Sequence, residues 1–303
     1  MLHIHLEGSV RLETLQAIAR RKEVTPPEET IYSFQNFTEF NAIFPKVFTQ
    51  ITEEIDFYEI TKAFAENLVK QNVSYCETFC VPLAHVRRGV PFEKFFPPII
   101  DALEEAERNL SVRVNLIFSI IRFGGNTDWG HQTLDLIERN PNPRIVGIDL
   151  AGPETFDTIA PFQSVYERAK SLGLHRTAHS GEFCGPEHIR QTLELLQVER
   201  IGHGITATDD ESVMRLLIEK DIPLEICPTS NVKLGAVSCW ETHPVRKLHD
   251  FGVPLVLGTD DPAFFDNTLV EEYENLRHHF GFTDAEIANI RHNEQKYAFE
   301  KVY

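Results

Sequence analysis

Eight short apolar runs, separated by polar turns and amphipathic stretches, constrain the fold of this 303-residue chain more than any other feature. Most of the runs are too short and too uniformly apolar for half-exposed strands, which is typical of parallel strands buried on both faces. Eight alternations of strand and helix predict an α/β fold, specifically a (β/α)₈ TIM barrel. The predicted strands are Leu2–Leu6, Val73–Val81, Val112–Ile121, Ile145–Leu150, Leu174–Ala178, Arg200–Ile201, Ile222–Ile226 and Val253–Leu257.

A doubly wound sheet is the alternative architecture, but no Gly-x-Gly-x-x-Gly motif follows any of the runs. A barrel of this kind commonly uses such a length as one domain. We therefore expect a single catalytic barrel domain over residues 1–303.

The gap between the first two runs predicts a helical insertion after the first strand, with a lid-like segment at about residues 26–54. Five phenylalanines lie in it at spacings of three or four. These spacings fit a helix face packed on the core, and they also fit a lid over the barrel mouth. As part of a lid, Phe37 would contact the substrate. The five residues are Phe34, Phe37, Phe40, Phe44 and Phe48.

The charge balance excludes several kinds of partner. The net charge of −17 argues against nucleic acid, because binding a phosphate backbone needs clustered Lys and Arg. It argues equally against an anionic membrane surface, and no apolar span or signal peptide is present. Five cysteines without framework spacing favour a reducing, cytoplasmic location. The expected partner is a small molecule, and a homo-oligomer remains possible.

Histidines and acidic residues follow four of the predicted strands at their C-terminal ends, which share one rim in a barrel. His3 and His5 are two residues apart, so both side chains point to the same side of a strand. His179 and Asp260 follow the fifth and eighth runs, and three imidazoles with one carboxylate suit zinc. Each residue also has a structural interpretation: strand histidines can be satisfied by backbone groups, and an Asp at a strand end can cap a helix.

Two further residues on this rim could move protons. Glu182 lies three residues after His179, where a carboxylate beside a metal-bound water could transfer a proton. His203 lies between two glycines and could approach a ligand closely. The alternatives are a solvated loop Glu and a core histidine. His-Glu-x-x-His, Gly-x-Ser-x-Gly and phosphate-loop motifs are absent, as is the Pro-Cys-x-x-Cys of nucleic-acid deaminases.

Five motifs, in order over nearly the whole chain, resemble those of the adenosine deaminase family of amidohydrolases. They are His3-x-His5-Leu6-Glu7-Gly8-Ser9, Ala178-His179-Ser180-Gly181-Glu182, Arg200-Ile201-Gly202-His203-Gly204, Cys227-Pro228-Thr229-Ser230-Asn231 and Thr259-Asp260-Asp261-Pro262.

The resemblance implies a barrel with one zinc ion per chain that hydrolyses the 6-amino group of an adenine ring and releases ammonia. The zinc ligands would be His3, His5, His179 and Asp260. Glu182 would protonate ring nitrogen N1, and His203 would orient and help deprotonate the zinc-bound water. Asp261 would contact N7, and the amide of Gly152 would reach N3.

One position departs from typical adenosine deaminases, which have Asp where this chain has Glu7, a position that touches the ribose 5′ hydroxyl. Glu7 with Arg11, and the stretches around residues 71–77 and 222–231, look closest to the aminodeoxyfutalosine deaminase branch of menaquinone synthesis. Adenosine deaminase and then adenine deaminase are the alternatives. A hydrolase of esters or amides and a non-catalytic purine-binding protein are further ones. With Glu7 and the phenylalanine segment on the 5′ side, we expect a 5′-extended adenosine as substrate.

Overall fold

Seven parallel strands form one sheet in the computed structural model, which describes residues 1–154 and 158–300. Each strand pairs with the next one along the chain, as the alternation of strand and helix predicts. The last three residues of the predicted domain lie outside the described residues. The strands are β1 (Tyr75–Cys80), β2 (Arg113–Ile121), β3 (Ile145–Ala151), β4 (His175–Ser180), β5 (Arg200–His203), β6 (Leu224–Ile226) and β7 (Leu255–Leu257).

The first predicted strand differs from the other seven, because it makes two isolated bridges instead of a continuous ladder. Ile4 bridges Asp260, just after β7, and His5 bridges Phe79 of β1. The chain then turns at once into the 3₁₀ helix η1 (Glu7–Ser9), which leaves no length for more pairing. Residues 3–6 nevertheless hydrogen-bond to both edges of the sheet, so the sheet and this segment form a closed ring.

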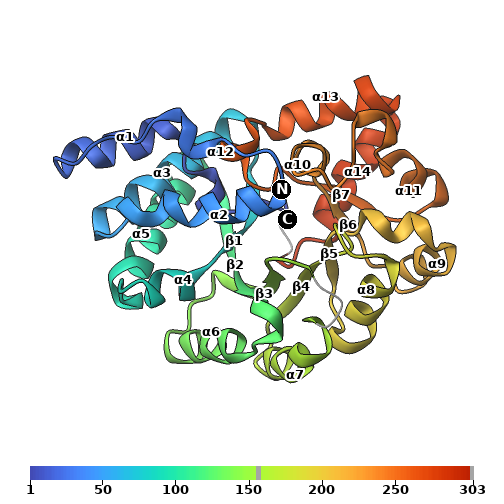
Figure 1. The fold of residues 1–303 in the computed structure, drawn as a ribbon, viewed down its shortest axis with the longest axis horizontal. Helices are drawn as coiled ribbons and strands as arrows, with labels where there is room; N and C mark the ends of the chain where they lie inside the picture. The colour runs from blue at the N-terminus through green and yellow to red at the C-terminus, as the bar shows by residue number, and fades with distance from the viewer. Residues whose placement is uncertain (155–157, 301–303) are drawn as a thin grey trace.

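The helices surround the sheet (Figure 1), and the hydrophobic side chains between them and the strands form the core. The helices are α1 (Leu12–Arg21), α2 (Phe37–Val47), α3 (Glu54–Lys70), α4 (Pro82–Arg87), α5 (Phe92–Leu110), α6 (Asp128–Arg139), α7 (Gln163–Ser171), α8 (Pro186–Gln191), α9 (Glu211–Glu219), α10 (Pro228–Lys233), α11 (Val245–Phe251), α12 (Pro262–Phe265), α13 (Leu269–Phe280) and α14 (Asp284–Lys296).

The phenylalanine-rich segment forms α2, flanked by the 3₁₀ helices η2 (Glu29–Tyr32) and η3 (Phe48–Gln50). Asn36 caps α2, because its side chain accepts a hydrogen bond from the amide of Glu39 at 3.0 Å. Phe40 is buried, and its ring lies 5.2 Å from Phe264 and 5.6 Å from Phe265 of α12. The helix therefore packs on the element that directly follows Asp260 and Asp261.

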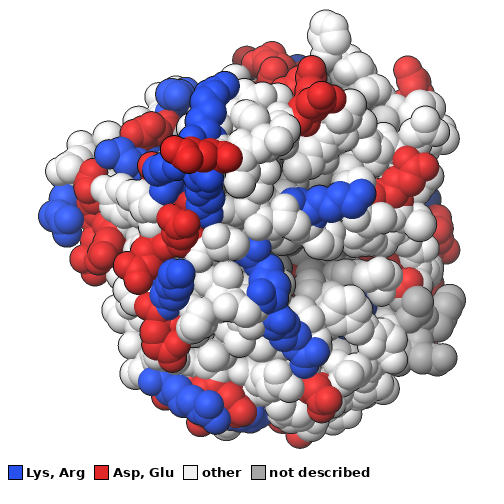
Figure 2. Space-filling model, turned by 60° about the vertical axis from the view of Figure 1, so that its left-hand side comes forward, with Lys and Arg blue, Asp and Glu red and all other residues white. Residues whose placement is uncertain are grey.

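The surface carries both signs of charge. On the face shown in Figure 2, Lys and Arg side chains are interspersed with Asp and Glu. Within the described residues, no helix combines the length and apolar character needed to cross a membrane. The five cysteines are all free thiols.

Candidate functional site

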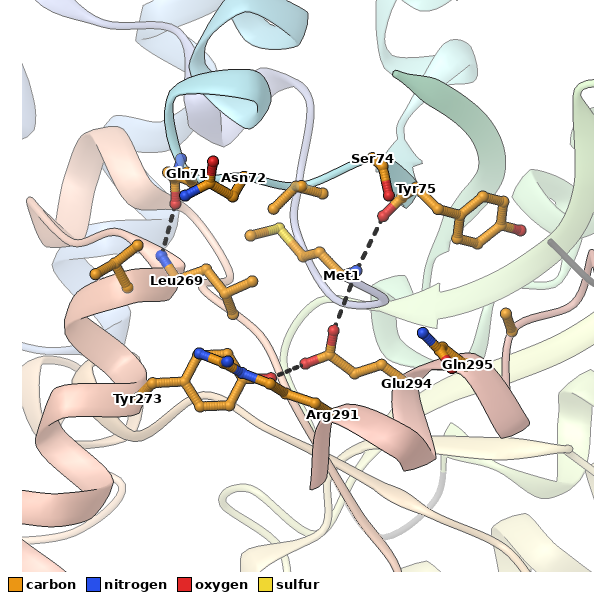
Figure 3. A pocket seen from close by; sticks show the side chains of 13 residues that line it. Met1, Gln71, Asn72, Ser74, Tyr75, Leu269, Tyr273, Arg291, Glu294 and Gln295 are labelled. Atoms are coloured by element: carbon orange, nitrogen blue, oxygen red, sulfur yellow. Dashed lines mark hydrogen bonds and ion pairs between the residues drawn. The ribbon is translucent and has the colours of Figure 1, made fainter. Parts of the chain in front are cut away.

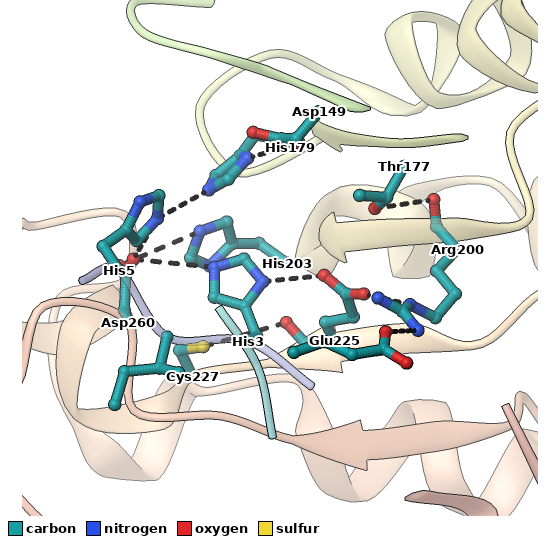
Figure 4. Close-up of polar contacts among 12 residues, drawn as sticks. His3, His5, Asp149, Thr177, His179, Arg200, His203, Glu225, Cys227 and Asp260 are labelled. Carbon is teal, nitrogen blue, oxygen red and sulfur yellow. Dashed lines mark hydrogen bonds and ion pairs between the residues drawn. The ribbon is translucent and has the colours of Figure 1, made fainter. Parts of the chain in front are cut away.

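The four predicted metal ligands converge at the C-terminal ends of the strands (Figure 4). His5 Nε2 lies 3.3 Å from His179 Nε2 and 3.2 Å from Asp260 Oδ1, and His3 Nε2 lies 3.5 Å from the same oxygen. All four side chains are buried. His203 belongs to the same cluster, since its Nε2 is 3.9 Å from Asp260 Oδ2.

Two buried carboxylates hold the outer nitrogens of these histidines. Glu225 of β6 lies 2.7 Å from His3 Nδ1, and Asp149 of β3 lies 3.0 Å from His179 Nδ1. A ring that donates its Nδ1 proton to a carboxylate presents the lone pair of Nε2 inward, as a metal ligand requires. His3 Nε2 is buried and has no hydrogen-bond partner, so it is open to a metal ion.

This geometry fits a zinc ion. Zinc bonds nitrogen and oxygen at about 2.0–2.2 Å, which separates the ligand atoms of a tetrahedral site by about 3.3–3.6 Å. The separations of three ligand-atom pairs, 3.2, 3.3 and 3.5 Å, lie close to that range, and ligand atoms of His3, His179, His203 and Asp260 all lie within 4.8 Å of one another. The local field favours a positive charge at this nitrogen, whether a proton or a metal ion: burial lowers the pKa of His3, but the nearby carboxylates of Asp260 and Glu225 outweigh it and raise this pKa to about 9.

A buried network of charged side chains holds Glu225, the carboxylate that contacts His3. Arg200 of β5 donates from Nε to Glu225 at 2.6 Å and from Nη1 to Glu77 of β1 at 2.5 Å. Its guanidinium also lies 3.6 Å from the ring centroid of Phe299 and donates to the carbonyl of Tyr297. His3 is therefore connected, through Glu225 and this arginine, to the C-terminal segment of the chain.

The two predicted proton-transfer residues lie side by side. His203 Nδ1 is 3.6 Å from Glu182 Oε1, and the amide nitrogen of Asn231 in α10 contacts both, at 3.1 and 2.8 Å. Burial first, and then the charges of Asp260 and Glu154, raise the pKa of Glu182 well above its usual value. Burial lowers the pKa of His203 well below its usual value. Both shifts favour the neutral forms, a protonated Glu182 and an uncharged His203.

A cavity of about 530 Å³ opens onto this cluster. Glu182, His203, Asp260, Asp261 and Gly152 line its inner part. A larger cavity of about 660 Å³ surrounds Met1 (Figure 3), but it contains none of the predicted site residues. The chemistry therefore identifies the smaller cavity as the candidate active site. Four of the five spaced phenylalanines line it: Phe37, Phe40, Phe44 and Phe48.

Asp261 and Gly152 occupy the cavity wall as the resemblance implies. Asp261 Oδ1 is buried without a hydrogen-bond partner. It lies so close to Gly8 that a Cβ at that position would approach it to 1.7 Å, which explains the need for glycine. Gly152 follows β3 with a φ of +91°, a conformation that favours glycine.

Glu7 is the predicted substrate contact that does not line the cavity. Its Oε1 accepts hydrogen bonds from the amide of Val81 at 3.0 Å and from His85 Nε2 at 3.0 Å. The other carboxylate oxygen is buried without a partner. His85 in turn contacts Arg88, which donates to the backbone carbonyls of Phe48 and Ile51. Glu7 is thus connected to the end of the phenylalanine segment through side chains of α4 and the residue that follows it.

The sequence analysis missed several supporting residues. Asp149, Glu225 and Arg200 lie in predicted buried strands, where a charged residue needs a partner, so their position was a usable signal. Asn231 was part of a quoted motif but received no role. His243, which contacts Asn231, carries no sequence signal that we can identify.

Comparisons with known proteins show which proteins this chain resembles. The family model described as adenosine deaminase matches residues 1–302. An adenine deaminase of Pseudomonas putida is 34% identical over 299 residues, covering 96% of this chain and 94% of that one. The crystal structure of an adenine deaminase from Arthrobacter aurescens has a TM-score of 0.93 at 31% identity, covering 99% and 93% of the two chains. An amidohydrolase from Burkholderia ambifaria with bound zinc has a TM-score of 0.90 at 27% identity, covering 99% and 85%.

Proposed function

We propose that this chain, which belongs to the adenosine deaminase family, uses one zinc ion to deaminate an adenine nucleoside that is extended at its 5′ position. Membership of the family makes it a hydrolytic deaminase of adenine- or adenosine-type substrates. The metal, the roles of individual residues and the extension on the substrate are the parts that we add.

One observation carries the proposal: three of the four proposed zinc ligands, His5, His179 and Asp260, line the same cavity as Glu182. Within the set of His3, His5, His179 and Asp260, three ligand-atom pairs lie 3.2–3.5 Å apart, close to tetrahedral spacing. Glu182 lies in the wall of that cavity, and burial favours its neutral form. A hydrolase of esters or amides does not require an acid for a ring nitrogen, whereas deamination of a purine does.

The residues divide the work of the reaction. Bound zinc would supply Lewis acidity and a nucleophile at neutral pH, by lowering the pKa of water to about 7. Glu182 would hold the proton that reaches ring nitrogen N1, which makes C6 accept an oxygen nucleophile and later release ammonia. His203 would orient the attacking water. Asp261, whose pKa is raised well above its usual value by burial and by the charge of Asp260, would donate from its protonated carboxyl group to N7, and the amide of Gly152 would donate to N3.

The outer part of the cavity supports the proposed 5′ extension. Aromatic rings of α2 form one wall, and we propose that this helix acts as a lid. The ring of Phe37 lies 4.4 Å from that of Phe183, which is 37% exposed, and Phe123 on the rim is 53% exposed. An aryl group that covered about 100 Å² of this surface would gain about 2.5 kcal/mol before ordering costs.

The position of Arg87 supports the proposal that the 5′ extension carries an acidic group. Arg87 and Arg88 are the arginines of the cavity lining, and Arg88 is already held by backbone carbonyls and His85. Arg87 lies over the ring of Trp129 at 4.8 Å and, among the described residues, has no carboxylate within 4.0 Å. Its guanidinium donates a hydrogen bond to the neutral side chain of Gln132 at 3.3 Å, and an exposed arginine without a described acidic partner is well suited to an anionic ligand group.

Adenine deaminase is the second candidate, because relatives at 34% and 31% identity carry that name. Free adenine would fill only the inner part of the cavity, and the aromatic wall and Arg87 would then have no ligand to contact.

Turnover on a panel tests the proposal. The zinc-loaded protein would be assayed for ammonia and the 6-oxo product with adenine, adenosine, methylthioadenosine and aminodeoxyfutalosine at equal concentrations. We expect the highest kcat/KM for aminodeoxyfutalosine and the lowest for adenine. Phe37→Ala should reduce the preference for the extended substrate, whereas Phe34→Ala, in the same segment but outside the cavity lining, should not. Highest turnover of adenine, with Phe37→Ala leaving the ranking unchanged, would favour adenine deaminase instead.

A further inference from the structure

We propose that His243, acting through Asn231, fixes which atoms of Glu182 and His203 carry their protons. The inference rests on the proposed function, since it concerns the acid and the imidazole of that reaction. It assigns His243 as a positioning residue, because its ring contacts neither the cavity nor the proposed metal ligands.

The backbone determines the tautomer of His243. This residue lies between the 3₁₀ helix η9 (Trp240–Thr242) and α11, and it is 5% exposed. The amide of Val245 donates to His243 Nδ1 at 3.1 Å, so that nitrogen is an acceptor. Burial lowers the pKa of His243 to about 4, which keeps the ring neutral. A neutral ring that accepts at Nδ1 must carry its proton on Nε2.

The Nε2 proton in turn orients the side-chain amide of Asn231. His243 Nε2 lies 3.2 Å from Asn231 Oδ1, and a donor at that place requires the amide oxygen to face it. The two N–H groups of Asn231 then point the other way, to Glu182 Oε1 at 2.8 Å and His203 Nδ1 at 3.1 Å. Asn231 is fully buried, so no water can replace these partners.

Both proton positions follow from this orientation. Because Glu182 Oε1 accepts from Asn231, the acidic proton is left on Oε2, where it can be given to a ring nitrogen. Because His203 Nδ1 accepts as well, its proton is on Nε2, the nitrogen that faces Asp260. A flipped amide would place an oxygen between the two residues and would draw both protons to the wrong atoms.

Three variants test this hydrogen-bonded series from His243 through Asn231 to Glu182 and His203, which we call the relay, in the zinc-loaded protein. His243→Phe keeps an aromatic ring but removes the donor, and it should lower kcat by about 10-fold or more with little change in KM. His243→Gln retains a donor near the position of Nε2 and should restore most of the activity. In an Asn231→Ala background, His243→Phe should cause no further loss, because the path through the amide is already broken.

A spectroscopic readout tests the same idea without turnover. Spectra of ¹⁵N-histidine-labelled protein should show His203 protonated on Nε2 in the parent and in His243→Gln, and on Nδ1 or mixed in His243→Phe. The inference is overturned if His243→Phe leaves kcat and the His203 tautomer unchanged. It is also overturned if His243→Phe lowers kcat by the same factor in the Asn231→Ala background as in the parent. A parent protein that releases no ammonia from any purine would refute the proposed function instead, and the tautomer spectra would still decide on the relay.

Discussion

Replacing Glu225 with Gln should weaken zinc binding without changing any of the four proposed ligands. The carboxylate of Glu225 holds His3 Nδ1 at 2.7 Å, and both side chains are fully buried. Gln has the same shape but no charge, so it orients the ring less strongly and makes Nε2 a poorer donor to a metal.

The size of the effect can be worked out from the geometry. The hydrogen bond, the width of the ring and a metal–nitrogen bond place the Glu225 charge about 7 Å from the ion. At an effective dielectric constant of about 20, a doubly charged ion at that separation attracts the carboxylate by about 4.7 kcal/mol. Arg200 offsets part of it, since it is paired with the same carboxylate. We therefore expect a 10–100-fold rise in Kd, or about 1.4–2.8 kcal/mol.

The assay is competition for zinc against a chromophoric chelator, with the melting temperature of the metal-free protein measured in parallel. Glu199→Gln is the matched control, because Glu199 forms the same kind of contact with His175 at 2.9 Å, on the surface and away from the cluster. Asp149→Asn tests the second carboxylate, which lacks an arginine partner and so provides an independent measurement if Glu225→Gln fails to fold. If both variants fold and bind zinc as tightly as the control, the proposed ligand geometry is wrong.

Three other outcomes can be measured directly. His5→Ala should lose zinc at least as severely as Glu225→Gln, as read by metal analysis, and full retention of metal would remove His5 from the ligand set. Glu182→Gln should keep zinc and melt near the parent temperature but lose at least about 10²-fold in kcat, and parent activity should fall as pH rises through the elevated pKa of Glu182, because the acid form is lost. Burial raises the pKa of Glu272 from 4.5 to about 7, so its share of stability is present below pH 4.5 and is lost as pH rises through 7, by about 3 kcal/mol. Glu272→Gln should flatten that dependence in denaturant titrations at pH 5 and 8.

Periodicity predicted the strands well because buried parallel strands leave a local signal, a short apolar run. Val112–Ile121 and Ile145–Leu150 match β2 and β3 to within one residue at each end. Leu2–Leu6 has the same composition, yet it forms only bridges, because the turn into η1 is set by contacts with the edges of the sheet.

The site was predictable where a residue type is itself uncommon at a strand end, as for His3, His5, His179 and Asp260. The residues that hold these side chains in place were not predictable, because they depend on contacts between residues distant in sequence. Glu225, for example, contacts His3 across 222 residues. Glu7 shows the limit of motif reasoning. Its chemistry suggested a substrate contact, but its environment pairs it with His85 outside the cavity lining, so its role stays a prediction.

The contact between Arg200 and the C-terminal segment has a consequence for how the chain tolerates trimming. Phe299 covers the guanidinium, and its amide donates to Glu77 at 2.6 Å. A protease cut after Lys296 would remove both contacts and would expose the buried ion pairs of Arg200 to water. Screening by water would weaken the hold of Glu225 on His3. Damage at one end of the sequence would therefore be detected as a loss of metal affinity at a histidine near the other end.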